Sequence, residues 1–96
     1  MRTIKFRGRD IDTGKFVSAE LGQVSAEIND EYLTFITDDV HLVDADSIAQ
    51  LVGFDLAGNE VYEGDFLIDE LEQEYTAEIY DRPEKIHALK LKEAQP

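Results

Sequence analysis

Residues 12–14 read Asp-Thr-Gly, the triplet that carries the catalytic carboxylate of aspartic proteases. In those enzymes two aspartates share one proton on a buried, hydrogen-bonded loop. Here Arg9, Asp10 and Lys15 flank the triplet and keep it solvated. Asp and Gly are also residues that turns prefer. The sequence therefore favours a turn over a protease site.

Acidic residues in the same region resemble the start of a calcium-binding loop, because Asp10 and Asp12 alternate ahead of Gly14. The segment lacks the third oxygen ligand and the late bidentate glutamate that such a loop needs. A second group of acids could gather divalent cations but is more typical of turns and exposed strand ends: Asp38, Asp39, Asp44 and Asp46. Neither His41 nor His87 has a histidine or cysteine nearby in the sequence to complete a zinc site. We therefore predict no metal and no cofactor.

The sequence lacks the common nucleophile and phosphate-binding motifs. No glycine elbow surrounds Ser18, Ser25 or Ser47, so acyl transfer has no support. The chain contains no cysteine, and no glycine-rich loop followed by lysine is present to cradle a phosphate. The sequence predicts no catalytic residues and a protein that is not an enzyme.

Charge is segregated along the 96-residue chain, which has 9 Lys and Arg against 22 Asp and Glu and a net charge of −13. No Lys or Arg occurs between Val17 and Asp81, a stretch with 18 acidic residues, whereas the first 16 residues carry five basic ones. Basic ends and an acidic middle attract each other within one fold or between subunits. Direct nucleic-acid binding is disfavoured, because phosphate contacts need clusters of Lys and Arg. The acidic middle can instead bind a basic host or phage protein, or serve solubility alone.

Neither a signal peptide nor a membrane span is expected. The first seven residues mix charged and apolar side chains, with no apolar run behind them. The longest apolar stretches, such as residues 66–68, are far too short to cross a bilayer. We expect a cytoplasmic protein that makes no membrane contact.

The first half of the sequence has the pattern of β-hairpins. Residues 3–7 alternate apolar and basic side chains and are followed by turn-forming residues, so residues 2–18 are predicted to form a hairpin. Residues 32–37 and 40–43 are rich in β-branched and aromatic types on either side of an Asp-Asp turn. The spacing of residues 21–30 fits a helix as well as an irregular segment.

Short strands and tight turns continue in the second half. Residues 48–54 fit a strand, with a short helix as the alternative, and a Gly58-Asn59 turn follows. Further strands are predicted over residues 60–62, 66–68, 75–80 and 86–91. The pattern predicts one mainly β domain over residues 1–91, a small antiparallel barrel or sandwich built from hairpins, with SH3-like character in its C-terminal half. Residues 92–96 are expected to form a frayed tail.

Two stretches of the sequence carry a family resemblance. The first reads Ile-Lys-Phe-Arg-Gly-Arg-Asp over residues 4–10, and the second covers residues 46–54 and continues through residues 58–67. In order and approximate spacing, the two stretches resemble the YopX family of phage and prophage proteins. Arg9 stands where that family usually carries Trp. The resemblance implies a phage or prophage origin, a β-rich fold and self-assembly, but no reaction and no catalytic residues.

The most specific part of this resemblance is the block Tyr62, Glu63, Gly64 and Asp65. Gly64 suits a bend with positive φ, and Asp65 can accept backbone N–H groups in that bend. Tyr62 offers an apolar ring with a hydroxyl group. One interpretation is a turn that fixes strand register. The other is a recognition loop that exposes Tyr62, Glu63 and Asp65.

The sequence thus leads to two hypotheses of function. The first is a non-enzymatic phage or prophage accessory protein that acts through protein–protein contacts and forms a homo-oligomer. The alternative is an acidic inhibitor that mimics nucleic acid and blocks a basic host DNA-binding protein. Binding of that second kind weakens strongly as salt is added.

Overall fold

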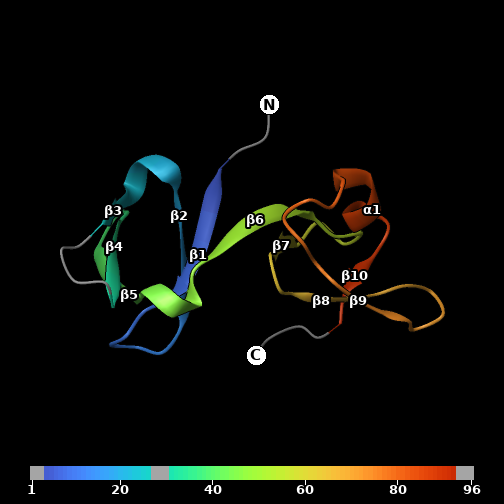
Figure 1. Cartoon of the computed structure of the whole chain (residues 1–96), viewed down its shortest axis with the longest axis horizontal. Helices are drawn as coiled ribbons and strands as arrows, with labels where there is room; N and C mark the ends of the chain where they lie inside the picture. Colours follow the sequence, from blue (N-terminus) through green and yellow to red (C-terminus); the bar gives the residue numbers. More distant parts are fainter. Residues whose placement is uncertain (1–3, 27–30, 93–96) are drawn as a thin grey trace. The chain divides into compact units, whose positions relative to one another are not determined.

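The chain is organised as two compact units, Met1–Gln50 and Leu51–Pro96. Figure 1 shows the computed structural model, which describes residues 4–26 and 31–92. Each unit has its own hydrophobic core. The two units are therefore taken one at a time.

The first unit begins with an antiparallel hairpin of β1 (Lys5–Arg9) and β2 (Phe16–Glu20). The turn between them is held by Asp10, whose Oδ1 accepts the backbone N–H of Asp12 at 2.8 Å. Gly14 completes the turn with a φ of 73°, a conformation that residues with a Cβ rarely adopt. The predicted hairpin and the turn interpretation of the Asp-Thr-Gly triplet are both confirmed.

A three-stranded antiparallel sheet follows, in the order β3-β4-β5. Its strands are β3 (Val24–Ala26), β4 (Tyr32–Ile36) and β5 (Val40–Asp44). Five residue pairs join β4 to β5, from Tyr32 opposite Asp44 to Ile36 opposite Val40. The two strands predicted on either side of the Asp-Asp turn are confirmed.

Two 3-10 turns flank this sheet. The first, η1 (Leu21–Gln23), opens the segment whose spacing left helix and irregular structure open. Residues 27–30 of that segment lie outside the described part of the chain. The second turn, η2 (Ala45–Ser47), begins behind Asp44, whose carboxylate accepts the N–H of Asp46 at 3.0 Å.

The core of the first unit is small and tightly packed. Its buried residues and the partly buried ones against them are Ala19, Phe35 and Val43, with Phe6, Val17, Val24 and Ile48. Gly8 on β1 permits this packing, because a Cβ there would meet Val43 and would stand 2.8 Å from Ile48 Cδ1. Real Cβ atoms do not come that close to a neighbour, so any larger residue at this position would push the core apart.

Strand β6 (Ala49–Phe54) begins in the first unit, where its first two residues pair with β1. It continues into the second unit, where it pairs with β7 (Glu60–Tyr62). The remaining strands are β8 (Phe66–Ile68), β9 (Glu74–Thr76) and β10 (Lys90–Leu91), in the order β10-β8-β9. β7 and β8 are therefore neighbours in sequence that belong to different sheets.

The strand predicted over residues 86–91 is wrong for most of its length. Helix α1 (Pro83–His87) comes first, and β10 is only two residues long. Pro83 favours a helix start, because its ring fixes φ near a helical value at the first helical position. Ile86 and Leu89, three residues apart, are both buried in the core, which is a helical spacing.

Six buried residues form the core of the second unit: Val52, Val61, Leu67, Ala77, Ile86 and Leu89. Ala77 explains why β9 is shorter than the strand predicted over residues 75–80. Its N–H donates to the carbonyl of Asp65 at 2.8 Å and its carbonyl accepts the N–H of Gly64 at 2.9 Å, so two residues of the bend face one residue and the regular β8–β9 ladder ends at Thr76.

The fold is mainly β, as predicted, with three small antiparallel sheets. Across residues 4–26 and 31–92 these sheets do not close into a barrel, and the sandwich-like alternative is the one consistent with the strands. No helix in the described part of the chain is long and apolar enough to cross a membrane. Lys92 donates its N–H to the carbonyl of Phe66 at 2.9 Å, and residues 93–96 of the expected tail lie outside the described residues. One domain over residues 1–91 stays a prediction.

Candidate functional site

The block singled out in the sequence lies in the bend between β7 and β8. Gly64 has a φ of 90°, the left-handed conformation that glycine adopts without strain. Asp65 closes the bend, because its Oδ2 accepts the N–H of Tyr62 at 2.8 Å and its own N–H donates to the Tyr62 carbonyl at 3.0 Å. The N–H of Gly64 donates to the carbonyl of Ala77 at 2.9 Å. The bend is thus held by hydrogen bonds to Tyr62, at its start, and to Ala77, which follows β9.

The block exposes fewer side chains than the recognition-loop interpretation requires. Tyr62 is buried, and its hydroxyl group donates to Glu60 Oε1 at 3.1 Å. Asp65 is half-buried and bonded within the bend, which leaves Glu63 as the exposed side chain of the block. Because β7 and β8 lie in different sheets, the bend connects two sheets and sets no hairpin register. Its geometry is that of a structural turn.

Aspartate carboxylates close turns throughout the described chain. Those that accept a backbone N–H from a residue two to four positions away are Asp10, Asp44, Asp55, Asp65, Asp69 and Asp81. Hydrogen bonds from N–H groups favour the ionised form of a carboxylate. A share of the acidic composition therefore serves the fold, and the glutamates supply most of the remaining acidic surface.

Asp55 is the most enclosed of these aspartates, with 1% of its surface exposed. Its Oδ1 accepts the N–H groups of Ala57 at 3.0 Å and Asn59 at 2.8 Å, and its Oδ2 accepts that of Leu91 at 3.1 Å. Burial alone would raise the pKa of Asp55, but the N–H groups of Leu91 and Asn59 bring the pKa below its usual value. One carboxylate thereby ties the β6–β7 turn to β10.

A histidine–aspartate pair that sequence reasoning missed lies in the first unit. His41 Nδ1 is 2.7 Å from Asp10 Oδ2, and Asp10 is buried. The contact with His41, and after it the N–H of Asp12, holds the pKa of Asp10 below its usual value. The pair forms because Asp10 bridges to Val43 on β5, two residues from His41 and on the same face of that strand. The signal for the pair in the sequence is the alternation of side chains along β5, which places His41 and Val43 on one face.

The pair has the geometry of an oriented imidazole, which occurs in catalytic and in structural sites. In the described residues, no three His, Asp or Glu side chains gather as metal ligands. Ser47, one of the serines considered as nucleophiles, accepts the N–H of Arg9 at 2.8 Å and donates to the carbonyl of Asp44 at 2.7 Å. His87 is exposed on α1. Asp10 and Ser47 thus have structural contacts, which join β1 and the turn after it to β5 and η2.

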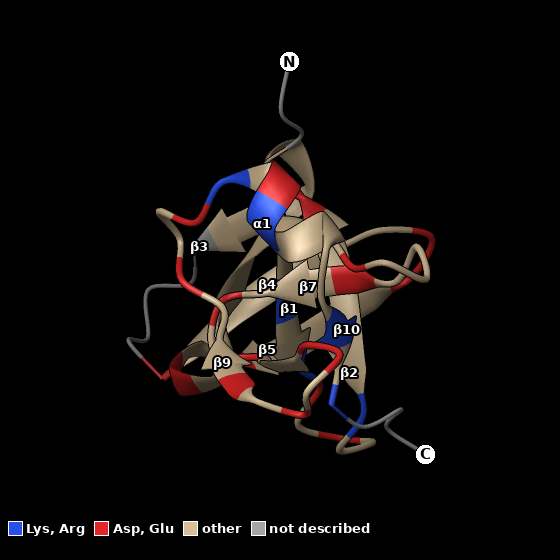
Figure 2. Cartoon of the chain, turned by 90° about the vertical axis from the view of Figure 1, so that its right-hand side faces the viewer, with Lys and Arg blue, Asp and Glu red and all other residues tan. Residues whose placement is uncertain are grey.

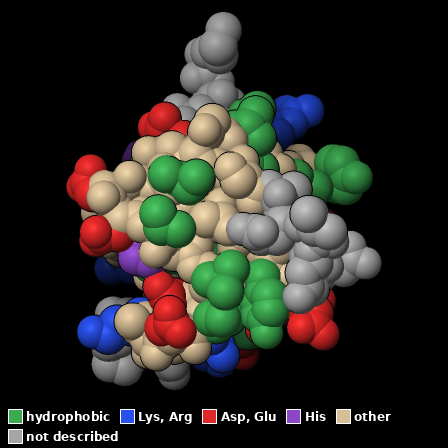
Figure 3. All heavy atoms as spheres, turned by 90° about the vertical axis from the view of Figure 1, so that its left-hand side faces the viewer, with side chains coloured by type: hydrophobic (Ala, Val, Ile, Leu, Met, Phe, Trp, Pro, Cys, Tyr) green, Lys and Arg blue, Asp and Glu red, His purple; other side chains and the backbone are tan. Residues whose placement is uncertain are grey.

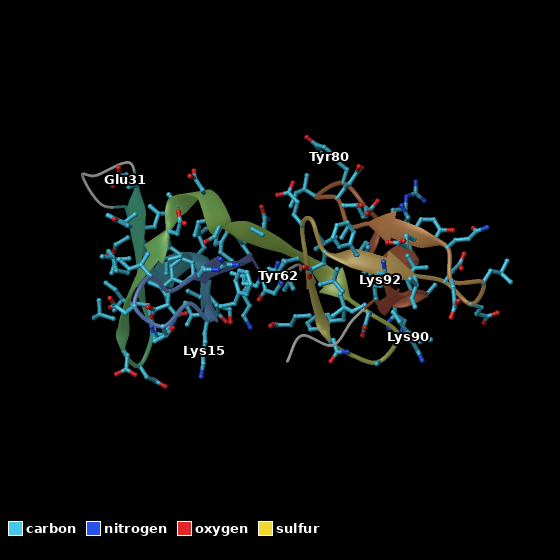
Figure 4. All side chains as sticks on the ribbon, turned by 90° about the horizontal axis from the view of Figure 1, so that it is seen from below. Lys15, Glu31, Tyr62, Tyr80, Lys90 and Lys92 are labelled. Carbon is cyan, nitrogen blue, oxygen red and sulfur yellow. The ribbon has the colours of Figure 1, made fainter. Side chains whose placement is uncertain are left out.

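The outward side of the β1–β2 hairpin carries an exposed aromatic ring beside two arginines. Phe16 lies opposite Arg9 in the ladder, and 48% of its surface is exposed. The guanidinium carbon of Arg7 lies 4.7 Å from the ring centre, and that of Arg9 lies 5.2 Å from it. Lys15 is exposed next to Phe16, and its side chain extends away from the ribbon (Figure 4). We call Arg7, Arg9, Lys15 and Phe16 the basic face.

The outward side of β4 and β5 is apolar near their shared turn. Ile36 and Val40 are partners in the ladder and are 48% and 72% exposed. Leu42 follows on the same side of β5, and the exposed Ile11 donates its N–H to the carbonyl of Leu42 at 3.0 Å. Figure 3 is turned toward these strands and shows hydrophobic side chains at the surface in several groups. We call Ile11, Ile36, Val40 and Leu42 the outer β4–β5 face.

Acidic side chains dominate the charge of the second unit, where residues 51–96 hold twelve Asp or Glu against four Lys or Arg. The exposed glutamates among them are Glu63, Glu70, Glu72, Glu74, Glu78 and Glu84. Two lysines each meet one acid, Lys85 with Asp81 at 3.1 Å and Lys92 with Glu74 at 2.9 Å. Figure 2 shows the acidic residues spread along the loops of this unit.

No family model matches the chain, and neither a curated protein nor a solved structure matches it significantly. The resemblance to the YopX family stays a prediction from the sequence. The functional argument below therefore rests on the geometry of the described residues.

Proposed function

We propose that this chain is a non-enzymatic accessory protein of phage or prophage origin, which acts through protein–protein contacts and associates with itself. The observation that carries the proposal is the outer β4–β5 face, on which Ile11, Ile36 and Val40 are exposed. The resemblance to the YopX family supports the origin and the self-assembly.

Covering this face with another protein surface is favourable. Burial of apolar surface contributes about 25 cal/mol for each Å² removed from water. Val40 is 72% exposed although it lies within a strand. The exposed acids Asp38 and Asp39 border the apolar residues in the turn, and an apolar centre with a polar rim is typical of protein contact sites. A second copy related by a twofold axis would bring the same face, so the two faces would cover each other.

The test places a charge at Val40, the most exposed residue of the face. We expect the wild-type chain to show a multiple of 10.9 kDa in sedimentation equilibrium at about 0.15 M salt, and Val40→Glu to show a clearly lower mass. Leu56→Glu is the matched control, because Leu56 is also exposed, at 54%, but lies in the second unit. A wild-type mass of one chain, or an unchanged multiple in Val40→Glu, would contradict the proposal.

The acidic mimic is a second candidate, and the exposed glutamates of the second unit favour it. Their side chains are exposed to solvent, whereas the carboxylates of Asp55 and Asp65 are held within turns. Reversal of four of them in one variant, Glu63→Lys, Glu70→Lys, Glu78→Lys and Glu84→Lys, should abolish capture of a basic host DNA-binding protein. Capture by the wild-type chain should also be lost between about 0.05 M and 0.5 M salt. Capture that survives both changes would exclude the mimic.

A further inference from the structure

We infer that the β8–β9 turn of one copy of the chain docks on the basic face of another copy. The docking segment is Glu70, Leu71 and Glu72, which we call the acidic turn. The inference rests on the proposed self-association and adds to it a polar contact between two different surfaces.

The basic face is prepared to receive carboxylates. Arg9 and Arg7 have their guanidinium groups over the ring of Phe16, so the ring limits the conformations of both side chains. Arg9 is exposed, and a carboxylate can bind two of the N–H donors in the plane of its stacked guanidinium group. Lys15 adds an exposed ammonium group at the start of β2. Phe16, 48% exposed, supplies an apolar centre among these cations.

The acidic turn is held in shape by Asp69. Its Oδ1 accepts the N–H groups of Leu71 at 2.8 Å and Gln73 at 2.9 Å, and its Oδ2 accepts the hydroxyl group of Tyr75 at 3.0 Å. Asp69 is therefore engaged inside the turn. Glu70 and Glu72 are exposed, and Leu71 between them is 79% exposed. In Figure 1 this turn is the loop that extends beyond the strands β8 and β9.

The two surfaces are complementary in charge and in polarity. The basic face has an exposed apolar ring among cations, and the acidic turn has an exposed apolar side chain between two anions. Contact between Phe16 and Leu71 removes both from water, while the glutamates lie within reach of the guanidinium and ammonium groups. The order Glu70, Leu71, Glu72 gives the turn this complementarity, because it places one aliphatic side chain between two acidic ones.

A second copy fits the basic face better than a nucleic acid does. A nucleic acid brings phosphates and bases but no aliphatic side chain to cover Phe16. It would also bring a long row of negative charges toward a chain of net charge −13, whereas the acidic turn brings two carboxylates. Because the two surfaces are different, two copies can dock reciprocally in a twofold dimer, or the contact can repeat head-to-tail as a ring or a chain of subunits.

A charge exchange tests the contact directly. The background is Val40→Glu, so that the outer β4–β5 face contributes no association. In this background we expect association that weakens about tenfold between about 0.05 M and 0.5 M salt. Arg9→Glu and Glu70→Lys should each weaken it about tenfold at low salt, and an equal mixture of the two variants should associate again. Lys90→Glu is the matched control for charge, since Lys90 is exposed on β10 and lies outside both surfaces.

The outcomes separate this contact from the proposed function. Association that is insensitive to salt and lost only in Val40→Glu supports the proposed function and overturns the docking of the acidic turn. Association that responds to Arg9→Glu but is unaffected by Val40→Glu supports the docking and overturns the outer β4–β5 face. If the wild-type chain stays a monomer but binds a single-stranded oligonucleotide of about 20 thymidines, and Arg9→Glu abolishes that binding, the basic face is a nucleic-acid site and the inference is wrong.

Discussion

Single carboxylates carry much of the local order of this chain, and Asp55 is the clearest example. Its replacement by alanine would leave the N–H groups of Ala57, Asn59 and Leu91 without their acceptor in a buried place. We expect Asp55→Ala to lower the free energy of unfolding by about 3 kcal/mol, because a buried unsatisfied donor costs about 1–3 kcal/mol. Urea denaturation measures it. Asp12→Ala is the control, an exposed acid expected to change stability by less than about 0.5 kcal/mol. Equal effects of the two substitutions would show that Asp55 does not hold the turn.

At the scale of the elements, the closeness of β1 and β5 depends on one position without a side chain. Gly8→Ala would place a Cβ against Val43 and Ile48, and overpacking of this kind costs about 1–3 kcal/mol. Gly22→Ala is a matched control, since nothing lies within 4 Å of a Cβ at Gly22. We expect thermal unfolding of Gly8→Ala at a clearly lower temperature and of Gly22→Ala at an unchanged one. A Gly8→Ala protein as stable as the wild type would mean that β1 and β5 can move apart freely.

The elements also show what sequence reasoning can reach. The β1–β2 hairpin and the β4–β5 pair were predictable, because period-2 alternation and turn residues are local signals. Helix α1 was not, because proline is typical of turns as well as of helix starts and five residues are too few to display a helical period. The separation of β7 from β8 was equally hidden, since the partners of β8 lie later in the chain. Local patterns specify elements, whereas pairing depends on contacts between distant residues.

The contacts of the candidate site also divide into those that local sequence predicts and those that depend on distant residues. That Asp65 accepts a backbone N–H next to Gly64 was predictable from residue types alone. The contact of Asp10 with His41 depends on a bridge between residues 33 positions apart, Asp10 and Val43, so the alternation along β5 predicts the contact only once that bridge is known. The basic face lies between these cases, because a hairpin register places Arg9 opposite Phe16, but the register itself had to be known.

At the scale of the whole molecule, two opposing effects of pH act on stability. Repulsion within a chain of net charge −13 decreases as pH falls and the net negative charge becomes smaller. The turn aspartates act in the other direction. Asp10, Asp55, Asp69 and Asp81 have pKa values below the unfolded value of 3.8; in Asp69 and Asp81 the N–H groups of Gln73 and Glu78 are the main cause. A carboxyl group whose folded pKa is lowered contributes stability above its unfolded pKa, and this contribution is lost as pH falls through the folded pKa.

Stability should therefore hold or rise from pH 7 to about pH 5 and fall steeply below about pH 4. Urea denaturation at a series of pH values measures the free energy of unfolding on both sides of this maximum. Added salt should flatten the rise, because it screens repulsion between exposed charges, and should leave the acid fall in place, because hydrogen-bonded carboxylates are screened less. Asp69→Asn serves as the comparison, since it removes one of the four carboxylates and should make the acid fall shallower. The prediction would be contradicted by a free energy of unfolding that already decreases between about pH 7 and pH 5, or that stays unchanged below about pH 3. Either result would mean that the ionised turn aspartates do not determine how the stability of this fold depends on pH.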